Sequence, residues 1–185
     1  MMASRRLLLG SWLAAAVLFT TAAALADTAS QNAKVRALFT PGDDIGAAIV
    51  QSIRVATNQI WVQAYSFTHK SIARALQEAA RRGVVVSVLA DREQFERGAS
   101  FLLRDLRLAG ADVRLDGEHG AAHNKIIVID AETNHAMVIT GSFNFTQAAQ
   151  KHNAENIIII DNDTALASAY AANWRRHWKH AAALE

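Results

Sequence analysis

Residues 123–130 read HNKIIVID, and this stretch decides how the rest of the chain is interpreted. The apolar run in its middle is typical of a β-strand. In an extended strand, residues two apart point the same way, so His123 and Lys125 share one face. Placing an imidazole and an ammonium group at the start of an apolar strand costs free energy unless both groups bind a partner or a ligand. Asp130 has the opposite parity at the strand end, so we expect it to support the fold through a turn or a cross-strand contact.

A second polar stretch follows about ten residues after this strand. In residues 141–146, GSFNFT, Ser142 and Asn144 share parity beside a glycine that lets backbone come close to a ligand. Glu155 then places a carboxylate at the beginning of another apolar strand. An imidazole, a cation, two neutral polar groups and a carboxylate suit displacement at a phosphodiester, because the cation and donors stabilise charge on the phosphate oxygens and the imidazole supplies a nucleophile.

Strand-like and helix-like periods alternate along the rest of the chain. Apolar and β-branched runs predict strands over residues 35–39, 60–67, 84–90, 111–115, 123–129, 136–140 and 157–160. Helical spacing predicts four helices. The first is capped by Asp43 or Asp44, the second is capped by Ser71 and ends at Gly83, and the others span residues 99–108 and 163–180. The predicted fold class is therefore α/β, with a mixed sheet sandwiched between helices on both faces.

The N-terminal residues have the pattern of an export signal. A charged start, an apolar run and an Ala-Leu-Ala sequence predict that residues 1–26 are a cleaved signal peptide; an uncleaved membrane anchor is the alternative. Residues 27–33 are a polar leader, residues 34–180 a single catalytic domain, and residues 181–185 a tail of the kind that cloning appends. We therefore expect a bacterial protein that is periplasmic or secreted, with no stable membrane insertion after cleavage.

Charge and cysteine content narrow the possible functions. The whole chain carries 19 Lys and Arg against 17 Asp and Glu, and loss of Arg5 and Arg6 with the signal peptide leaves 17 against 17. A polyanion must then meet a local patch and not a global field. The chain has no cysteine, which excludes disulfides and thiolate metal sites. We see no metal-ligand spacing either, and we interpret His177 and His180 as a solvated pair.

The two polar stretches resemble the signature of the phospholipase D superfamily. The pattern His123-x-Lys125-x-x-x-x-Asp130 with Gly141-Ser142-x-Asn144 downstream is most similar to its branch of small bacterial endonucleases, which carry one motif per chain. The resemblance also includes AYSFT at 64–68 and RGV at 82–84, and covers most of residues 35–180. The turn between Asp130 and Gly141 is a few residues longer than in that branch.

This resemblance implies a role for each matching residue. His123 would attack phosphorus and form a phosphohistidine. Lys125 and Asn144 would hold the phosphate oxygens, with help from Ser142. Glu155 would orient the imidazole, and Asp130 would be a structural and electrostatic support within the catalytic set. The family's reaction needs no metal or other cofactor.

One motif per chain predicts a homodimer. The mechanism needs one imidazole to attack and another to protonate the leaving oxygen, and His177-Trp178-Lys179 fails as a second motif because Leu184 stands at the eighth position. The partner should supply the second His123 across a two-fold axis, so that both subunits share one active site.

Three functions fit these observations. The first is a nuclease that cleaves DNA, and RNA as a second substrate, with little sequence specificity. Arg92, Arg97 and Arg104 follow a central strand and would line its groove. The second is a phospholipase D-type hydrolase of phospholipid head groups. Such an enzyme should expose an apolar rim or an interfacial helix, and the mature chain offers no strong amphipathic candidate. The third is a catalytically idle nucleic-acid-binding module, against which the intact polar set argues.

Overall fold

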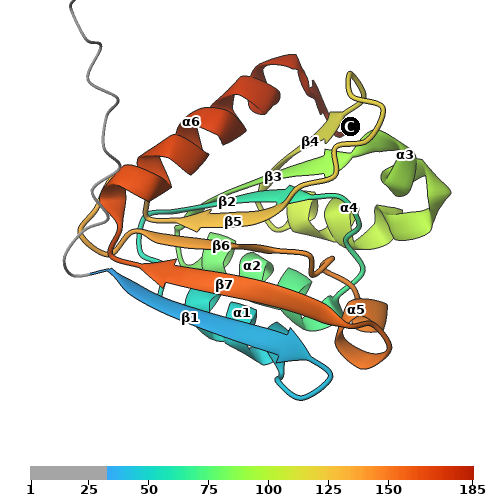
Figure 1. The fold of residues 1–185 in the computed structure, drawn as a ribbon. Helices are drawn as coiled ribbons and strands as arrows, with labels where there is room; N and C mark the ends of the chain where they lie inside the picture. Colours follow the sequence, from blue (N-terminus) through green and yellow to red (C-terminus); the bar gives the residue numbers. More distant parts are fainter. Residues whose placement is uncertain (1–32) are drawn as a thin grey trace, which may run out of the picture.

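A mixed β-sheet with helices on both faces forms the framework of the computed structural model, which describes residues 33–185 (Figure 1). The predicted signal peptide, 1–26, and the leader up to residue 32 lie outside the described residues. The described part contains no helix long and apolar enough to cross a membrane.

The sheet has eight strands within residues 33–185. They are β1 (Lys34–Thr40), β2 (Gln59–Ala64), β3 (Val85–Asp91), β4 (Asp112–Asp116), β5 (Lys125–Ile129), β6 (Met137–Gly141), β7 (Glu155–Asp161) and β8 (Ala182–Ala183). Their order across the sheet is β1-β7-β6-β5-β2-β3-β4-β8. Strands β2, β3 and β4 run parallel to one another, and the other neighbouring pairs are antiparallel.

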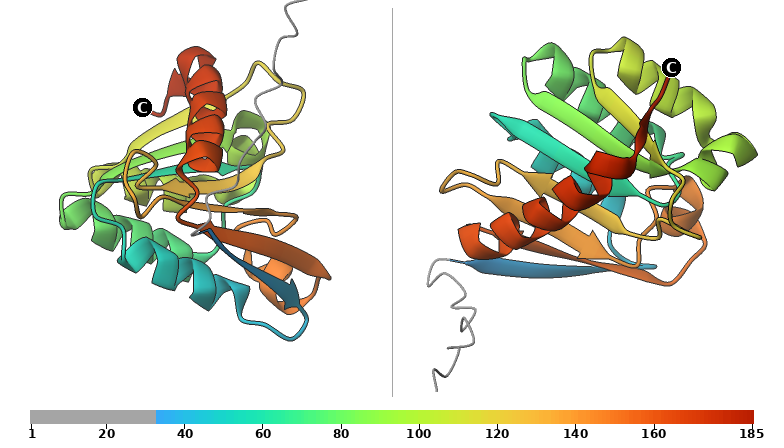
Figure 2. Two further views of the ribbon diagram at one scale, coloured as in Figure 1. Left: turned by 60° about the vertical axis from the view of Figure 1, so that its left-hand side comes forward. Right: turned by 90° about the horizontal axis from the view of Figure 1, so that it is seen from above.

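Helices cover both faces of this sheet. They are α1 (Ile45–Arg54), α2 (Lys70–Arg81), α3 (Arg92–Gln94), α4 (Ser100–Leu108), α5 (Gln147–Lys151) and α6 (Thr164–His180), and a π-helical segment, Phe95–Ala99, joins α3 to α4. Helices α1, α2 and α4 lie on one face, and α6 crosses the other face alone (Figures 1 and 2). The predicted fold class is confirmed.

Strand β5 shows why the apolar pattern gives this layering. Ile127 and Ile129 belong to the larger apolar core, which also includes buried residues of α1, α2 and α4. Ile126 and Val128 point the other way, into the smaller cluster beneath α6. Because both faces of β5 are covered, nearly every position in it must be apolar, and each fully buried Ile contributes about 1.5–3 kcal/mol.

Most helix boundaries agree with the sequence analysis, but one cap does not. Asp44 caps α1 by accepting from the backbone N–H of Ala47, as predicted. Ser71 was predicted to cap α2, and this is wrong: the cap is His69, whose ring accepts from the backbone N–H of Ile72. His69 is also buried. Imidazole is an uncommon cap, so residue preference alone favoured the serine.

The C-terminal residues are part of the sheet and not a free tail. Ala182 and Ala183 pair with β4 as strand β8, and Leu184 is buried and donates its backbone N–H to Val113. The folded domain therefore extends beyond residue 180. The strand predicted over residues 123–129 begins at Lys125 in the structure, so His123 lies in the loop before β5.

Candidate active site

Most of the polar residues that the sequence singles out lie at one edge of the sheet, which we call the site edge. They are His123, Lys125, Ser142, Asn144 and Glu155. Strands β2 and β6 end there and β5 and β7 begin there, on the right-hand side of Figure 1. The strand register fixes their relative positions, because Ala64 pairs with Lys125 and Gly141 pairs with Ile157. Residues just before or after these pairs must therefore lie close together, although they are far apart in the sequence. Ala64 and Glu155, for example, are 91 positions apart.

His123 and Lys125 form the centre of this edge. The Lys125 ammonium nitrogen lies 3.0 Å from Nδ1 of His123 and also donates to the His123 backbone carbonyl. His123 is exposed, whereas Lys125 is only 7% exposed. The Tyr65 ring packs against both, with its centroid 4.4 Å from that of the imidazole and 4.9 Å from the ammonium nitrogen. Tyr65 was not predicted as a site residue; its place directly after β2 is the signal that could have identified it.

Burial affects the charge on Lys125. Removal from water lowers the pKa of Lys125, and the negative charge of Glu155 partly offsets this by raising it. A cation that has already lost much of its water interacts strongly with an anion that enters the site. The Lys125 ammonium donates to Nδ1 of His123, so the neutral ring carries its proton on Nε2. Attack through Nε2 therefore requires the ammonium to move to a phosphate oxygen and Nδ1 to find an acceptor.

Glu155 does not supply that acceptor within one chain. Its carboxylate accepts from the Ser142 hydroxyl at 2.6 Å and from the Asn153 side-chain amide at 2.9 Å, and its backbone N–H donates to the Thr40 hydroxyl at 3.0 Å. The family resemblance implies that Glu155 orients the imidazole. The structure instead ties Glu155 to the 142–144 loop, next to the Lys125 ammonium and without a hydrogen bond to His123.

The loop after β6 is held close to β7 by a glycine. A Cβ atom at Gly141 would collide with the Asn156 carbonyl oxygen, so only glycine fits. Beyond it, Phe143 and Phe145 are buried, and Ser142 and Asn144 alternate with them toward the site edge. The side-chain oxygen of Asn144 is buried and has no hydrogen-bond partner. A buried polar atom without a partner is costly, and a bound ligand can remove that cost.

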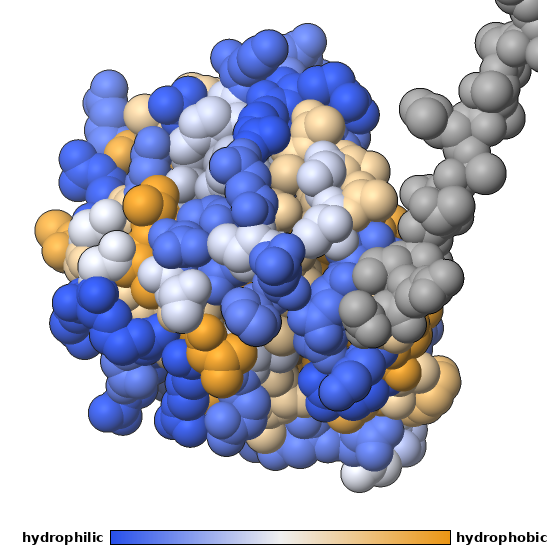
Figure 3. Space-filling view, turned by 90° about the vertical axis from the view of Figure 1, so that its left-hand side faces the viewer, coloured by the Kyte–Doolittle hydropathy of each residue, from blue (hydrophilic) through white to orange (hydrophobic). Residues whose placement is uncertain are grey.

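Asp130 lies at the opposite end of β5 from His123. Its carboxylate accepts four hydrogen bonds of 2.8–3.0 Å, from the backbone N–H groups of Thr57, Asn58 and Gln59 and from the Thr57 hydroxyl. Burial raises the pKa of Asp130, but these hydrogen bonds together lower it further, below its ordinary value. Asp130 therefore ties the end of β5 to the beginning of β2 and touches no residue of the site edge. That end of the molecule is mostly hydrophilic, with small separate apolar patches (Figure 3).

The three arginines assigned to a groove have different surroundings. Arg92 packs against Gly117 in the loop that leads to His123. Arg97 forms an ion pair with Glu93 on the surface, and Arg104 lies over the Phe95 ring with 5.3 Å between Cζ and the centroid. Arg92 and Arg97 follow the end of β3 on the site side of the sheet, whereas Arg104 is one helix further on.

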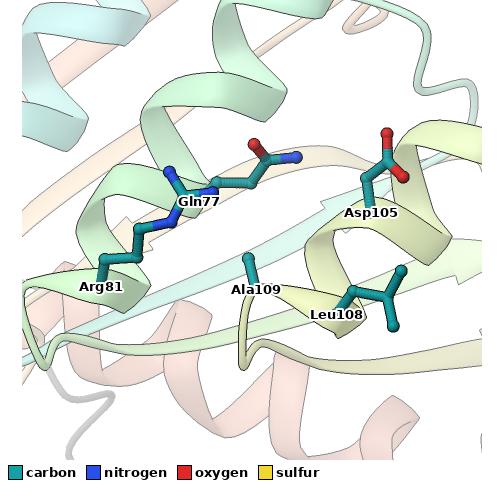
Figure 4. Close-up of a pocket in the computed structure, with 5 residues that line it drawn as sticks. All are labelled: Gln77, Arg81, Asp105, Leu108 and Ala109. Atoms are coloured by element: carbon teal, nitrogen blue, oxygen red, sulfur yellow. The ribbon is translucent and has the colours of Figure 1, made fainter.

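Two other features lie apart from His123 and Lys125. A groove between the C-terminal halves of α2 and α4 is lined by Gln77, Arg81, Asp105, Leu108 and Ala109 (Figure 4). Its acid and base are exposed surface groups, so it offers no set of reactive side chains. Three histidines and Asp116 form a second cluster, in which one atom of each residue lies within 4.8 Å of the others. No metal-ligand spacing marks these residues in the sequence, because Asp116 and His180 come together only in the fold.

The chain is similar to several known proteins. The family model described as "Cardiolipin synthase, PLD-like domain" matches residues 49–178. A phospholipase D from Rickettsia conorii is 44% identical over 143 residues, which are 77% of this chain and 68% of that protein. A mitochondrial cardiolipin hydrolase from Xenopus laevis is 38% identical over 115 residues, which are 62% of this chain and 52% of that protein.

A solved structure shows the same fold at higher coverage. The crystal structure of Nuc from Salmonella typhimurium, described as a phospholipase D family member, superposes with a TM-score of 0.78 and 30% sequence identity. The match covers 83% of this chain and 99% of that one.

Proposed function

This chain belongs to the phospholipase D superfamily and is a phosphodiesterase of that superfamily, and we propose that it cleaves nucleic acid through a phosphohistidine at His123. The observation that carries the proposal is an exposed imidazole beside a buried ammonium group. Because the imidazole is exposed, a polymeric substrate can reach it. Because the ammonium group is partly removed from water, it can bind a phosphate oxygen strongly. DNA is the expected substrate, with RNA second, and little sequence specificity.

The reaction proceeds in two displacements. A ring nitrogen of His123 attacks phosphorus, the bond from phosphorus to the leaving oxygen breaks, and a second imidazole gives that oxygen a proton. Water then attacks phosphorus, the phosphorus–nitrogen bond breaks, and the second imidazole takes the proton of the water. Lys125 and the amide of Asn144 bind the non-bridging oxygens, where charge accumulates. No step uses a metal ion.

The second imidazole comes from a second copy of the chain. The described residues place no other histidine beside His123 and Lys125. Val35 and Phe39 on β1 and Ile158 on β7 are 64%, 57% and 40% exposed. The strand register puts all three on the sheet face that α6 only partly covers, and the patch reaches the site edge at Phe39. An exposed apolar patch beside an incomplete site supports a dimer with a shared active site.

Nucleic acid is favoured over lipid by the resemblance of the motif to the small endonuclease branch and by Arg92 and Arg97 beside the site edge. The mature chain has no net charge excess, so positive charge for a polyanion must be local. Arg92 would provide it, because Glu93 offsets the charge of Arg97. The second candidate is hydrolysis of phospholipid head groups. The names of the Rickettsia and Xenopus relatives favour it.

An assay on purified mature protein separates these candidates. Plasmid DNA, single-stranded DNA, RNA and phospholipid vesicles are offered with a chelator present. We expect DNA cleavage that disappears in His123→Ala and falls by about 10²–10³-fold in Lys125→Met, the usual effect of removing one oxyanion-binding group. Acid-quenched reactions with labelled substrate should trap phosphate on His123.

His135→Ala is the matched control, because His135 is an exposed histidine on the turn after β5. Head-group release from vesicles without DNA cleavage would establish the lipid candidate instead. Binding of DNA with no turnover on any substrate would point to the idle module. Export of the chain is a separate prediction, which N-terminal sequencing of secreted protein can check.

A further inference from the structure

The second cluster of titratable side chains lies where β4 ends and α6 ends. Asp116 is the last residue of β4, and His119 follows in the loop that leads to His123. His177 and His180 lie three residues apart in the last turn of α6. The side chain of Asp116 is 0% exposed, whereas those of His119, His177 and His180 are 42%, 21% and 25% exposed. One buried carboxylate is therefore covered by three imidazoles that solvent can reach.

We propose that Asp116, His119, His177 and His180 bind a divalent transition-metal ion, best Zn²⁺, which fastens the loop of His123 to helix α6. Three imidazoles and a carboxylate are a ligand set that suits zinc in a tetrahedral arrangement. The site is separate from the proposed reaction and takes no part in its steps.

Distances within the cluster fit such an ion. Asp116 Oδ2 lies 3.0 Å from Nδ1 of His119, 3.6 Å from Nδ1 of His177 and 3.2 Å from Nε2 of His180. A tetrahedron with bonds of about 2.0–2.1 Å to the metal has edges of about 3.3 Å, so the three oxygen–nitrogen distances already match. All four ligand atoms lie within 4.8 Å of one another, so the imidazoles need only draw closer together.

Hydrogen bonding leaves one ligand without a partner. Asp116 accepts from the backbone N–H groups of Glu118 and His119 and from the rings of His119 and His180. These contacts use the acceptor capacity of a carboxylate. Nδ1 of His177 is buried and has no hydrogen-bond partner. A metal ion at the centre of the cluster would give that nitrogen the partner that the protein does not.

A carboxylate also lies behind one of the proposed ligands. Glu118 lies 3.6 Å from the other ring nitrogen of His180 and can orient it, as carboxylates do behind metal-bound histidines.

The elements that carry the ligands are held in place without the ion. Strand β8 pairs with β4 and keeps the end of α6 against the sheet. Trp174 donates to the Val62 carbonyl at 3.0 Å and stacks on Trp178, with 4.5 Å between centroids. The loop itself is tied at its far end, where Ala122 donates to Asp91. A metal would add a direct link between His119 of the loop and the two histidines of α6, beside the contact of Glu118 with His180.

Titration of tag-free protein with ZnCl₂ tests the site. Calorimetry and metal analysis after gel filtration should show one Zn²⁺ per chain, and Co²⁺ should give the visible absorption of a tetrahedral centre. Zn²⁺ should also raise Tm. His177→Ala and His119→Ala should each weaken Zn²⁺ binding by about 100-fold or more, since loss of a direct ligand exceeds the 10–100-fold typical of outer partners.

Two controls make the result decisive. His135→Ala and His123→Ala should bind Zn²⁺ as the wild type does, and the second of these separates the metal site from the proposed catalytic histidine. His119 lies in a loop and is the most exposed ligand, so its variant should fold, as circular dichroism can verify. Folded His119→Ala and His177→Ala proteins with unchanged Zn²⁺ affinity would overturn the proposal, as would wild-type protein that takes up no ion. None of these readouts depends on catalytic activity.

Discussion

At the scale of single residues, Asp130 has a different task from the other members of its motif. It receives four hydrogen bonds from residues 57–59 and lies at the far end of β5 from His123. Its positive φ of 49° places it in the left-handed region, which Asp tolerates better than most residues. The motif therefore places His123 and Lys125 at one end of β5 and, at the other end, Asp130, which holds β5 to the start of β2.

Replacement of Asp130 by Asn should lower the free energy of unfolding while leaving His123 and Lys125 in place. The amide cannot accept all four hydrogen bonds, so we expect a loss on the order of 2–4 kcal/mol at neutral pH in urea unfolding. Asp105→Asn, on an exposed carboxylate, should change stability by less than about 0.5 kcal/mol.

This loss should depend on pH. Hydrogen bonds outweigh burial and place the folded pKa of Asp130 below its unfolded value of about 3.9. The stabilisation is therefore complete above the unfolded pKa and disappears as the pH falls through the folded pKa. Wild type and Asp130→Asn should therefore approach each other in stability as the pH falls below about 4. A difference in the free energy of unfolding that did not change with pH would contradict this role of the Asp130 carboxylate.

At the scale of elements, the end of β6 depends on a close backbone approach. Gly141→Ala would push a Cβ atom against the Asn156 carbonyl and the Ile157 backbone, which cannot swing aside as a flexible side chain can. We expect a stability loss of about 1–3 kcal/mol and a displaced 142–146 loop, measured by urea unfolding and by phosphodiesterase rate. Gly120→Ala adds the same methyl group where no atom lies within 4 Å, so it should have little effect on stability.

The sequence was sufficient for most elements because their patterns are local. The apolar run at 126–129 and the cap at Asp44 need only neighbouring residues to be recognised. Strand β8 has two alanines and no pattern of its own, so pairing with β4 alone makes it a strand. The cap at His69 and the partners of Glu155 depend on segments far away in the chain. The same holds for Asp116 and His180, 64 positions apart, whose contact no spacing rule predicts.

At the scale of the whole molecule, the proposed reaction is incomplete in one chain. Within residues 33–185, His123 meets no second imidazole at the site edge, and Nδ1 of its ring lacks a carboxylate acceptor. Glu155 is held instead by Ser142 and Asn153. A second copy across a two-fold axis would bring another imidazole, and another carboxylate, to the same edge. If both imidazoles are needed, a dimer with one defective His123 should be inactive.

Mixing of subunits tests this requirement. Wild-type protein is unfolded and refolded together with an equal amount of His123→Ala, so that subunits combine at random. Random pairing leaves about a quarter of the dimers with two intact histidines, so activity should fall to about a quarter of the all-wild-type value at the same total protein. Chains that work alone would retain about half. His135→Ala in place of His123→Ala should leave activity unchanged, which shows that refolding itself is harmless. Activity that stayed at half with the defective partner would mean that each chain carries a complete site.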